Sequence, residues 1–197
     1  MKSTFLLLLK CASCRILFGE ITMSFVQLAV RACVVYVAVV FVSLPAVASS
    51  QEWTWCDGGA GIDVDRRIAG CTKIIKSGKE TPEKLATAFN NRGNAHHNKG
   101  DYDLAVQDFD QAIKLSPTFA FPFYNRALSF VEKGEFDRAI GDYDVYVRLV
   151  PADPDGFSSR GIAYNDKGDY DRAIQDYDKA ISLKADDAGA LNNRGKG

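Results

Sequence analysis

The sequence contains few of the residues on which catalytic and metal sites most often depend. It has two histidines, two tryptophans and two methionines among 197 residues. The histidines, His96 and His97, are adjacent, and neighbouring positions of a helix point in different directions, so they cannot hold one metal ion together. No Ser/His/Asp or Cys/His arrangement is visible, and the glycine-rich segment 57–61 lacks the Lys-Ser/Thr of a phosphate-binding loop. We therefore expect no catalytic residue, no metal, no cofactor and no enzymatic activity.

Neither sign of charge dominates the chain. Residues 49–197 carry 24 acidic and 20 basic side chains, a net charge of −4. A nucleic-acid partner is not expected, because non-specific binding needs clustered positive charge to displace counterions. With 25% charged and 47% hydrophobic residues, the composition also excludes a disordered tail, a collagen-like fibre and a multi-span membrane protein.

Long apolar runs are confined to the first 48 residues. Residues 32–42 are uninterruptedly apolar, Arg31 precedes them and Ala46-Val47-Ala48 follows, which is typical of a secretory signal peptide cleaved after Ala48. Met23 would start a leader of normal length, so translation from Met23 is an alternative to Met1. The run is short for a bilayer-spanning helix, although an uncleaved anchor remains the alternative. We expect an exported protein, periplasmic or secreted, with no membrane insertion after cleavage.

The cysteines agree with export. Three of the five lie in the presumed leader, which leaves Cys56 and Cys71 in the body. Two cysteines 15 positions apart in an exported chain predict a disulfide, since a metal site would need further ligands nearby.

The body repeats with a period of 34 residues. Arginine, glycine, alanine and aspartate recur in register through three units, residues 86–119, 120–153 and 154–187. Within each unit apolar residues follow the i, i+3, i+4, i+7 spacing of a helix, and a Lys-Gly-Asp/Glu segment separates two such helices. The sequence therefore predicts an all-α stack of antiparallel helix hairpins, each burying its apolar side against the next.

These residues resemble the tetratricopeptide repeat (TPR) family, whose 34-residue pattern is W-x2-L-G-x2-Y followed by Ala, Phe, Ala and Pro. The tryptophan slot holds Phe89, Phe123 and Phe157, and the glycine slot holds Gly93, Ala127 and Gly161. Tyr146 departs from the second alanine slot, and we expect it to separate the second and third units or change their angle. The resemblance implies a right-handed superhelical solenoid and a protein-binding role.

The segments that flank the three units are incomplete repeats. In the N-terminal extension, residues 49–85, a capping helix is predicted at 63–77 with Asp63 as its N-cap. The W-x-W-C…C pattern of this extension is similar to that of exported bacterial TPR proteins. Residues 188–197 begin a fourth unit and then stop, so we expect fraying there and suspect a truncated reading frame.

The recurring arginines have a structural interpretation. Each is followed 16 residues later by an aspartate, so intra-unit ion pairs are predicted. The predicted pairs are Arg92–Asp108, Arg126–Asp142 and Arg160–Asp176. Arg194 would have no partner. The other aspartates of the second helices are expected to face solvent, and they lack the loop spacing of a calcium-binding EF-hand.

The TPR resemblance implies a concave groove lined by the first helices. Its candidate residues are Asn90, Asn94, His97, Phe121, Tyr124, Leu128, Val131 and Asn165. They lack the lysines and arginine with which chaperone-binding TPR domains clamp a terminal carboxylate. We expect a scaffold that binds a partner protein or peptide by apolar contact and asparagine hydrogen bonds. Alternatively, Phe121 and Tyr124 only pack against neighbouring units, and the C-terminal face forms a homo-oligomer or docks on an envelope complex.

Overall fold

A computed structural model of the chain describes residues 50–184, 189 and 193–195. The chain divides into two compact units, Met1–Pro45 and Ala46–Gly197, and every described residue belongs to the second. The predicted leader, residues 1–48 with either start, lies outside the described residues, as does most of the predicted fourth repeat. Within the described part, no helix is both long and apolar enough to cross a membrane.

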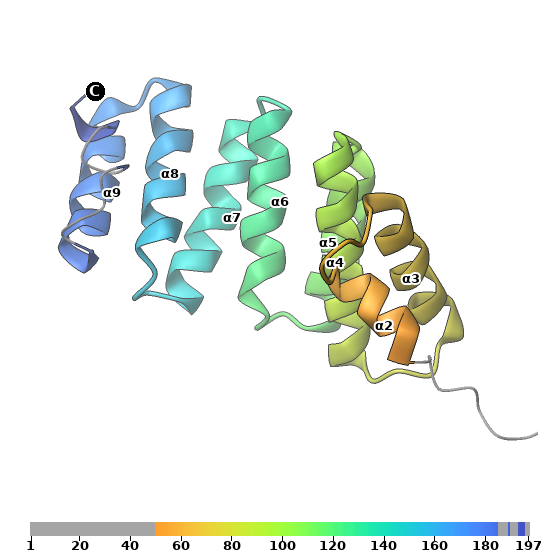
Figure 1. The fold of residues 1–197 in the computed structure, drawn as a ribbon. Coiled ribbons are helices and arrows are strands. Elements are labelled where there is room, and N and C mark those ends of the chain that lie inside the picture. The colour runs from red at the N-terminus through yellow and green to blue at the C-terminus, as the bar shows by residue number, and fades with distance from the viewer. Residues whose placement is uncertain (1–49, 185–188, 190–192, 196–197) are drawn as a thin grey trace, which may run out of the picture. The chain divides into compact units, whose positions relative to one another are not determined.

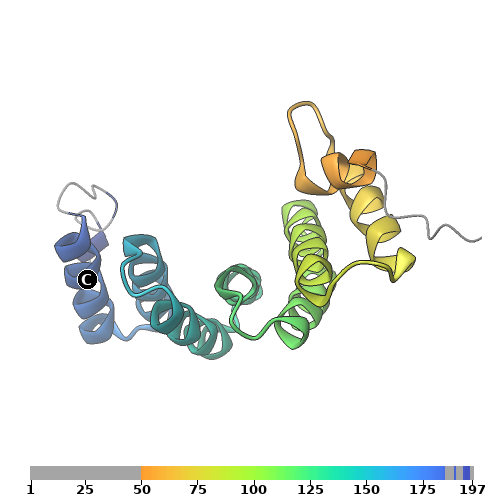
Figure 2. The same cartoon turned by 90° about the horizontal axis from the view of Figure 1, so that it is seen from below.

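The described residues form eight α-helices and no strand. The helices are α2 (Ser50–Asp57), α3 (Val64–Ser77), α4 (Pro82–Lys99), α5 (Tyr102–Leu115), α6 (Ala120–Glu132), α7 (Phe136–Leu149), α8 (Pro154–Lys167) and α9 (Tyr170–Leu183). Each packs mainly on the helix before it and the helix after it (Figure 1). The hairpins α4–α5, α6–α7 and α8–α9 follow one another in chain order (Figure 2), so the predicted solenoid of helix hairpins is confirmed.

The ends of α4 illustrate how the local sequence sets each hairpin. Thr81 precedes the helix and accepts a hydrogen bond from the backbone N–H of Lys84, while Pro82 occupies the first turn. The helix ends at Gly100, whose φ of 82° lies in the left-handed region that favours glycine. The two later hairpins turn at glycines with the same conformation.

The two helices of a hairpin approach closely at a small residue on the first helix. A Cβ atom added to Gly93 would lie 2.6 Å from the ring of Phe109, and one added to Gly161 would lie 2.7 Å from Tyr177. Ala127 fills the same position in the middle hairpin and is fully buried. The aromatic ring of the second helix therefore occupies the space that a larger side chain would need.

Tyr146 is accommodated by a second glycine. The tyrosine is 3% exposed, and a Cβ atom added to Gly156 of α8 would lie 2.8 Å from its ring. Its hydroxyl donates to the carboxylate of Asp153 at the start of α8. The extra volume of the tyrosine is thus matched by the missing side chain of Gly156, a compensation that the sequence analysis did not foresee.

The capping helix is present as predicted. It is α3, with the Asp63 side chain accepting from the backbone N–H of Arg66 at its start and Gly78 at its end. The helix α2 before it was not predicted, because eight residues are too short to be stable alone and show no apolar periodicity.

Tertiary contacts hold α2 in place. Cys56 and Cys71 are fully buried and joined by a disulfide. Gly70 lets the two helices touch, because a Cβ atom there would lie 2.7 Å from the Cβ of Trp55. The Arg67 side chain donates to the carbonyl of Cys56. The disulfide and these contacts fix α2 as a cap on the first end of the array.

Candidate functional site

The periodic arginines form forked ion pairs inside each hairpin. In each pair, Nε and Nη2 of the arginine donate to the two oxygens of one aspartate at 2.6–2.8 Å. The pairs are Arg92–Asp108, Arg126–Asp142 and Arg160–Asp176. Each guanidinium also lies 5.4–5.9 Å from the ring of the phenylalanine three residues before it. The arginines are therefore engaged within the fold and do not form a ligand site.

Two of these arginines also hold the preceding hairpin. The Nη1 atom of Arg126 bonds Asp110 on α5, and that of Arg160 bonds Asp144 on α7 at 2.7 Å. Arg92 uses the same atom to donate to Thr72 of α3. The hydrogen bond to Asp176 raises the pKa of Arg160 above its already high value, so this guanidinium stays charged.

Two predictions about charge were wrong. Arg194 is not without a partner, because its Nε lies 2.9 Å from Asp178 on α9. Asp110 and Asp144 are not simply solvent-facing, because each accepts from the arginine of the next hairpin. We call the whole series of arginine–aspartate contacts the arginine ladder.

Two of the predicted groove residues, Asn90 and Tyr124, are occupied by contacts between successive hairpins. Asn90 is 6% exposed and accepts from the Asn125 amide of α6 at 2.9 Å. The Tyr124 hydroxyl lies 2.9 Å from the Ser159 hydroxyl on α8. The Tyr124 ring packs 5.6 Å and 4.9 Å from the rings of Tyr143 and Tyr146 on α7. The packing alternative therefore holds for Tyr124, and Asn90 is not available to a ligand.

His97, another of the predicted groove residues, is half-buried. Its Nδ1 lies 3.0 Å from the hydroxyl of Ser129 on α6, and its ring contacts the edge of Tyr102. Burial lowers the pKa of His97, with the charge of Glu132 acting in the opposite direction. His97 is a contact between the first two hairpins.

Leu128 and Val131 are half-buried and pack against the core. Both polar and apolar side chains remain accessible on the first helices. We define the first-helix face by Asn94, Asn98, Phe121, Glu132, Ile162, Asn165 and Asp166. Phe121 and Glu132 are 11 residues apart on α6, about three helical turns, so they lie on one side. Glu132 and Asp166 are 34 residues apart and occupy equivalent positions of successive hairpins.

The first-helix face carries apolar and acidic groups and no basic side chain. Phe121 is 56% exposed and Ile162 is 38% exposed. The lysines that end the first helices instead form ion pairs with acidic side chains of preceding helices. These pairs are Lys99–Asp65, Lys133–Asp103 and Lys167–Asp137, at 2.5–2.8 Å. Among the described residues, neither Glu132 nor Asp166 has a cationic partner within 4 Å.

Three clefts of the described surface are relevant to the candidate site. One of about 240 Å³ lies on the first-helix face and is lined by Ile162, Asn165, Asp166, Tyr177 and Asn193. Another, of about 370 Å³, lies between α2 and α4 and is lined by Trp53, Asp57, Lys84 and Thr87.

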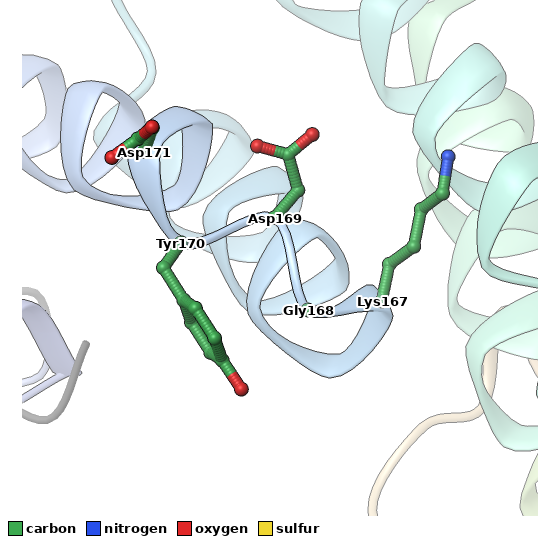
Figure 3. A pocket seen from close by; sticks show the side chains of 5 residues that line it. All are labelled: Lys167, Gly168, Asp169, Tyr170 and Asp171. Atoms are coloured by element: carbon green, nitrogen blue, oxygen red, sulfur yellow. The ribbon is translucent and has the colours of Figure 1, made fainter.

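The third cleft, also of about 370 Å³, surrounds the turn between α8 and α9. Figure 3 shows Lys167 and Asp169 extending to one side of this turn and Tyr170 to the other. Lys167 pairs with Asp137 and Asp169 pairs with Arg172, so these two charged groups of the turn are neutralised within the protein. In the part of the chain that the structure describes, no group of three His, Cys, Asp or Glu side chains is placed to hold a metal ion.

Comparison with known families agrees with this architecture. The family model for the tetratricopeptide repeat matches residues 86–119, and a second TPR repeat model matches residues 161–196. The chain contains tetratricopeptide repeats. Its TPR hairpins carry the first-helix face on α4, α6 and α8.

Solved TPR structures have the same fold. MamA from Desulfovibrio magneticus RS-1 (residues 41 to the end) is 20% identical, with a TM-score of 0.65 over 76% of this chain and 84% of that one. Another MamA structure is 24% identical, with a TM-score of 0.63 over 78% of this chain and 86% of that one. The first TPR of Spaghetti (RPAP3), solved bound to the HSP90 peptide SRMEEVD, is 24% identical, with a TM-score of 0.56 over 58% and 90%.

Proposed function

We propose that this protein is a non-enzymatic scaffold of an exported compartment whose first-helix face binds a segment of a partner protein. The observation that carries the proposal is the exposure of Phe121 and Ile162 on the same side of the array as the free amides and carboxylates. Large side chains that stay exposed on a rigid surface are frequent anchors of protein interfaces. The RPAP3 domain bound to SRMEEVD is a precedent for peptide binding on this fold.

The surrounding contacts favour a preformed site. Tyr124, Asn90 and His97 tie successive first helices together by hydrogen bonds near 3 Å. A partner segment would therefore meet a surface whose helices are already fixed relative to one another, which lowers the entropy cost of binding. Asn94, Asn98 and Asn165 would hydrogen-bond the backbone of that segment, because an amide side chain both donates and accepts.

Export is part of the proposal and rests on the apolar leader and on the buried disulfide, which persists in oxidising compartments. Mass spectrometry of the protein from the exported fraction is expected to find an N-terminus at Ser49 and Cys56 linked to Cys71. Intact residues 1–48 in that fraction would contradict cleavage, and a reduced pair would contradict an oxidising compartment.

Crosslinking in the exported fraction followed by mass spectrometry tests the binding face. The test variant is F121A/I162A, which removes the two large apolar side chains exposed on this face, and its melting curve is compared with that of the wild type because Phe121 also contacts Tyr146. The matched control is L104A, because Leu104 is 46% exposed but lies on the second helix α5. We expect one set of crosslinked partners for the wild type and L104A and its loss for F121A/I162A. Equal crosslinking by all three proteins would refute the proposal.

A further inference from the structure

The cleft on the first-helix face brings together an uncompensated carboxylate and the hydroxyl of a buried tyrosine. Asp166 lines it, and the structure gives this carboxylate no hydrogen bond or ion pair among the described residues. Tyr177 lines it as well and is 2% exposed. Nothing in the described part of the chain hydrogen-bonds its hydroxyl. That hydroxyl is accessible from the cleft, so it can donate a hydrogen bond to a ligand there or accept one from it.

The equivalent hydroxyl one hairpin earlier has a protein side chain beside it. Tyr143 occupies the same position of α7 and is 1% exposed, and its hydroxyl lies near Ser159, which also bonds Tyr124. Asn193 takes the place of Ser159 beside Tyr177 and lines the cleft. Both hairpins thus have a buried tyrosine at this position. A protein side chain lies beside the hydroxyl of Tyr143, whereas the hydroxyl of Tyr177 faces the cleft.

The electrostatic environment of the cleft is negative. Burial raises the pKa of Tyr177, and the nearby carboxylates of Asp166 and Asp176 raise it further. Asp176 is neutralised by Arg160, but Asp166 is not. Asp166 also lies in the last turn of α8, where the helix dipole adds partial negative charge.

The cations nearest in sequence are directed elsewhere. Lys167 bonds Asp137 of α7, and Arg194 bonds Asp178 of α9. The acceptors that remain around the cleft are the Asp166 carboxylate, the Asn165 amide oxygen and the Tyr177 hydroxyl, and Ile162 supplies an apolar wall. This combination matches a long side chain with an apolar stem and a cationic end.

We infer that this cleft binds a lysine or arginine side chain of the segment held on the first-helix face. The inference rests on the proposed function and names the chemistry of the partner. A volume of about 240 Å³ equals that of roughly eight water molecules at ~30 Å³ each, which is room for one such side chain. The partner is therefore basic and apolar, in contrast to the acidic peptide SRMEEVD of the RPAP3 structure.

Selection of peptides from a random 12-residue library on the immobilised full chain tests the inference. Four proteins are compared: the wild type, D166N, D171N and F121A/I162A. D171N is the matched control, because Asp171 is an exposed acid of α9 outside this cleft and its change alters the net charge equally. Circular dichroism melting curves establish that each variant is folded.

We expect the wild type and D171N to enrich peptides with a lysine or arginine beside apolar residues, and D166N to enrich apolar peptides without that preference. If the wild type enriches peptides with no preference for lysine or arginine, or if D166N keeps that preference, the inference is overturned and the proposed function still stands. No enrichment by the wild type over F121A/I162A would overturn both.

A chemical substitution in the ligand gives an independent measurement. In one enriched peptide the arginine is replaced by citrulline, which has a similar shape but no charge. Fluorescence anisotropy is expected to show about a tenfold loss of affinity on the wild type and on D171N, and little further loss on D166N. An equal loss on D166N would show that the arginine binds elsewhere and would overturn the inference.

Discussion

The arginine ladder makes a sharp prediction about stability at its central member. Arg126 is 19% exposed, and it contacts Asp142 of its own hairpin and Asp110 of the preceding one. These two carboxylates differ in environment, because the Asp142 side chain is 10% exposed and that of Asp110 is 48% exposed. Removing each in turn separates a buried partner from an exposed one on the same guanidinium.

The magnitudes differ accordingly. D142A leaves a largely buried guanidinium without its forked partner and is expected to lower the free energy of unfolding by about 3 kcal/mol. D110A removes an exposed contact and is expected to cost about 0.5 kcal/mol. The double variant R126L/D142L removes both buried charges and is expected to lie within about 1 kcal/mol of the wild type, because the only charge left without its partner is the half-exposed Asp110.

Urea unfolding followed by circular dichroism measures all three variants. For a body of this size, 3 kcal/mol corresponds to a fall in Tm of about 6–12 °C. Equal losses for D142A and D110A would show that burial does not decide the contribution of these pairs. If R126L/D142L were as unstable as D142A, the loss would lie in packing and not in the uncompensated charge, and the reasoning would be refuted.

Three further predictions concern other parts of the fold. G93A, whose Cβ would lie 2.6 Å from Phe109, is expected to lower the free energy of unfolding by about 1–3 kcal/mol. G141A, whose Cβ would meet nothing within 4 Å, is expected to raise it by about 0.5 kcal/mol. Denaturant midpoints that shift in the same direction for both variants would contradict the packing described for Gly93. C56S/C71S is expected to lose about 3 kcal/mol, so its Tm should match that of the reduced wild type; an unchanged Tm would mean that the disulfide adds nothing to α2. The pKa of His97 is lowered by burial, so its contribution to stability is complete above the unfolded value and is lost as the pH falls through the folded one. Denaturation midpoints at pH 7.5 and 5.5 are therefore expected to differ more for the wild type than for H97Q, and an equal difference would exclude this contribution.

The contacts within a hairpin could be predicted from the sequence, because they recur at fixed separations. The spacing of 16 residues placed Arg126 beside Asp142, and the small residue at Gly93 indicated close approach to Phe109. Both follow from the geometry of two antiparallel helices joined by a short turn, which the 34-residue period specifies directly.

The contacts between hairpins could not be predicted in the same way. Asn90, Tyr124 and Phe121 all lie on the same broad side of a first helix, and the resemblance to the TPR family assigned all three to a groove. Only the distance and tilt of the next hairpin decide that the first two are covered and that Phe121 stays 56% exposed. The partner of Arg126 on α5 was missed for the same reason, since the search for partners stayed inside one repeat.

The helix α2 was missed for a different reason. It is neither amphipathic nor long, and its position depends on the disulfide and on the gap left by Gly70. The cleft beside Tyr177 was also beyond the sequence analysis, because the access of its hydroxyl to a cleft depends on how the neighbouring side chains are arranged.

The arginine ladder also determines where the array can be cut and joined. Arg160 belongs to the hairpin α8–α9 in the sequence, yet one of its two carboxylates, Asp144, is supplied by the hairpin before it. If a hairpin were copied into another solenoid at its repeat boundary, its arginine would keep the aspartate of its own hairpin but lose the one on the preceding hairpin. To lengthen this protein, the unit to insert is the second helix of one repeat together with the first helix of the next. This unit contains both the arginine and the aspartate of the preceding helix with which it pairs.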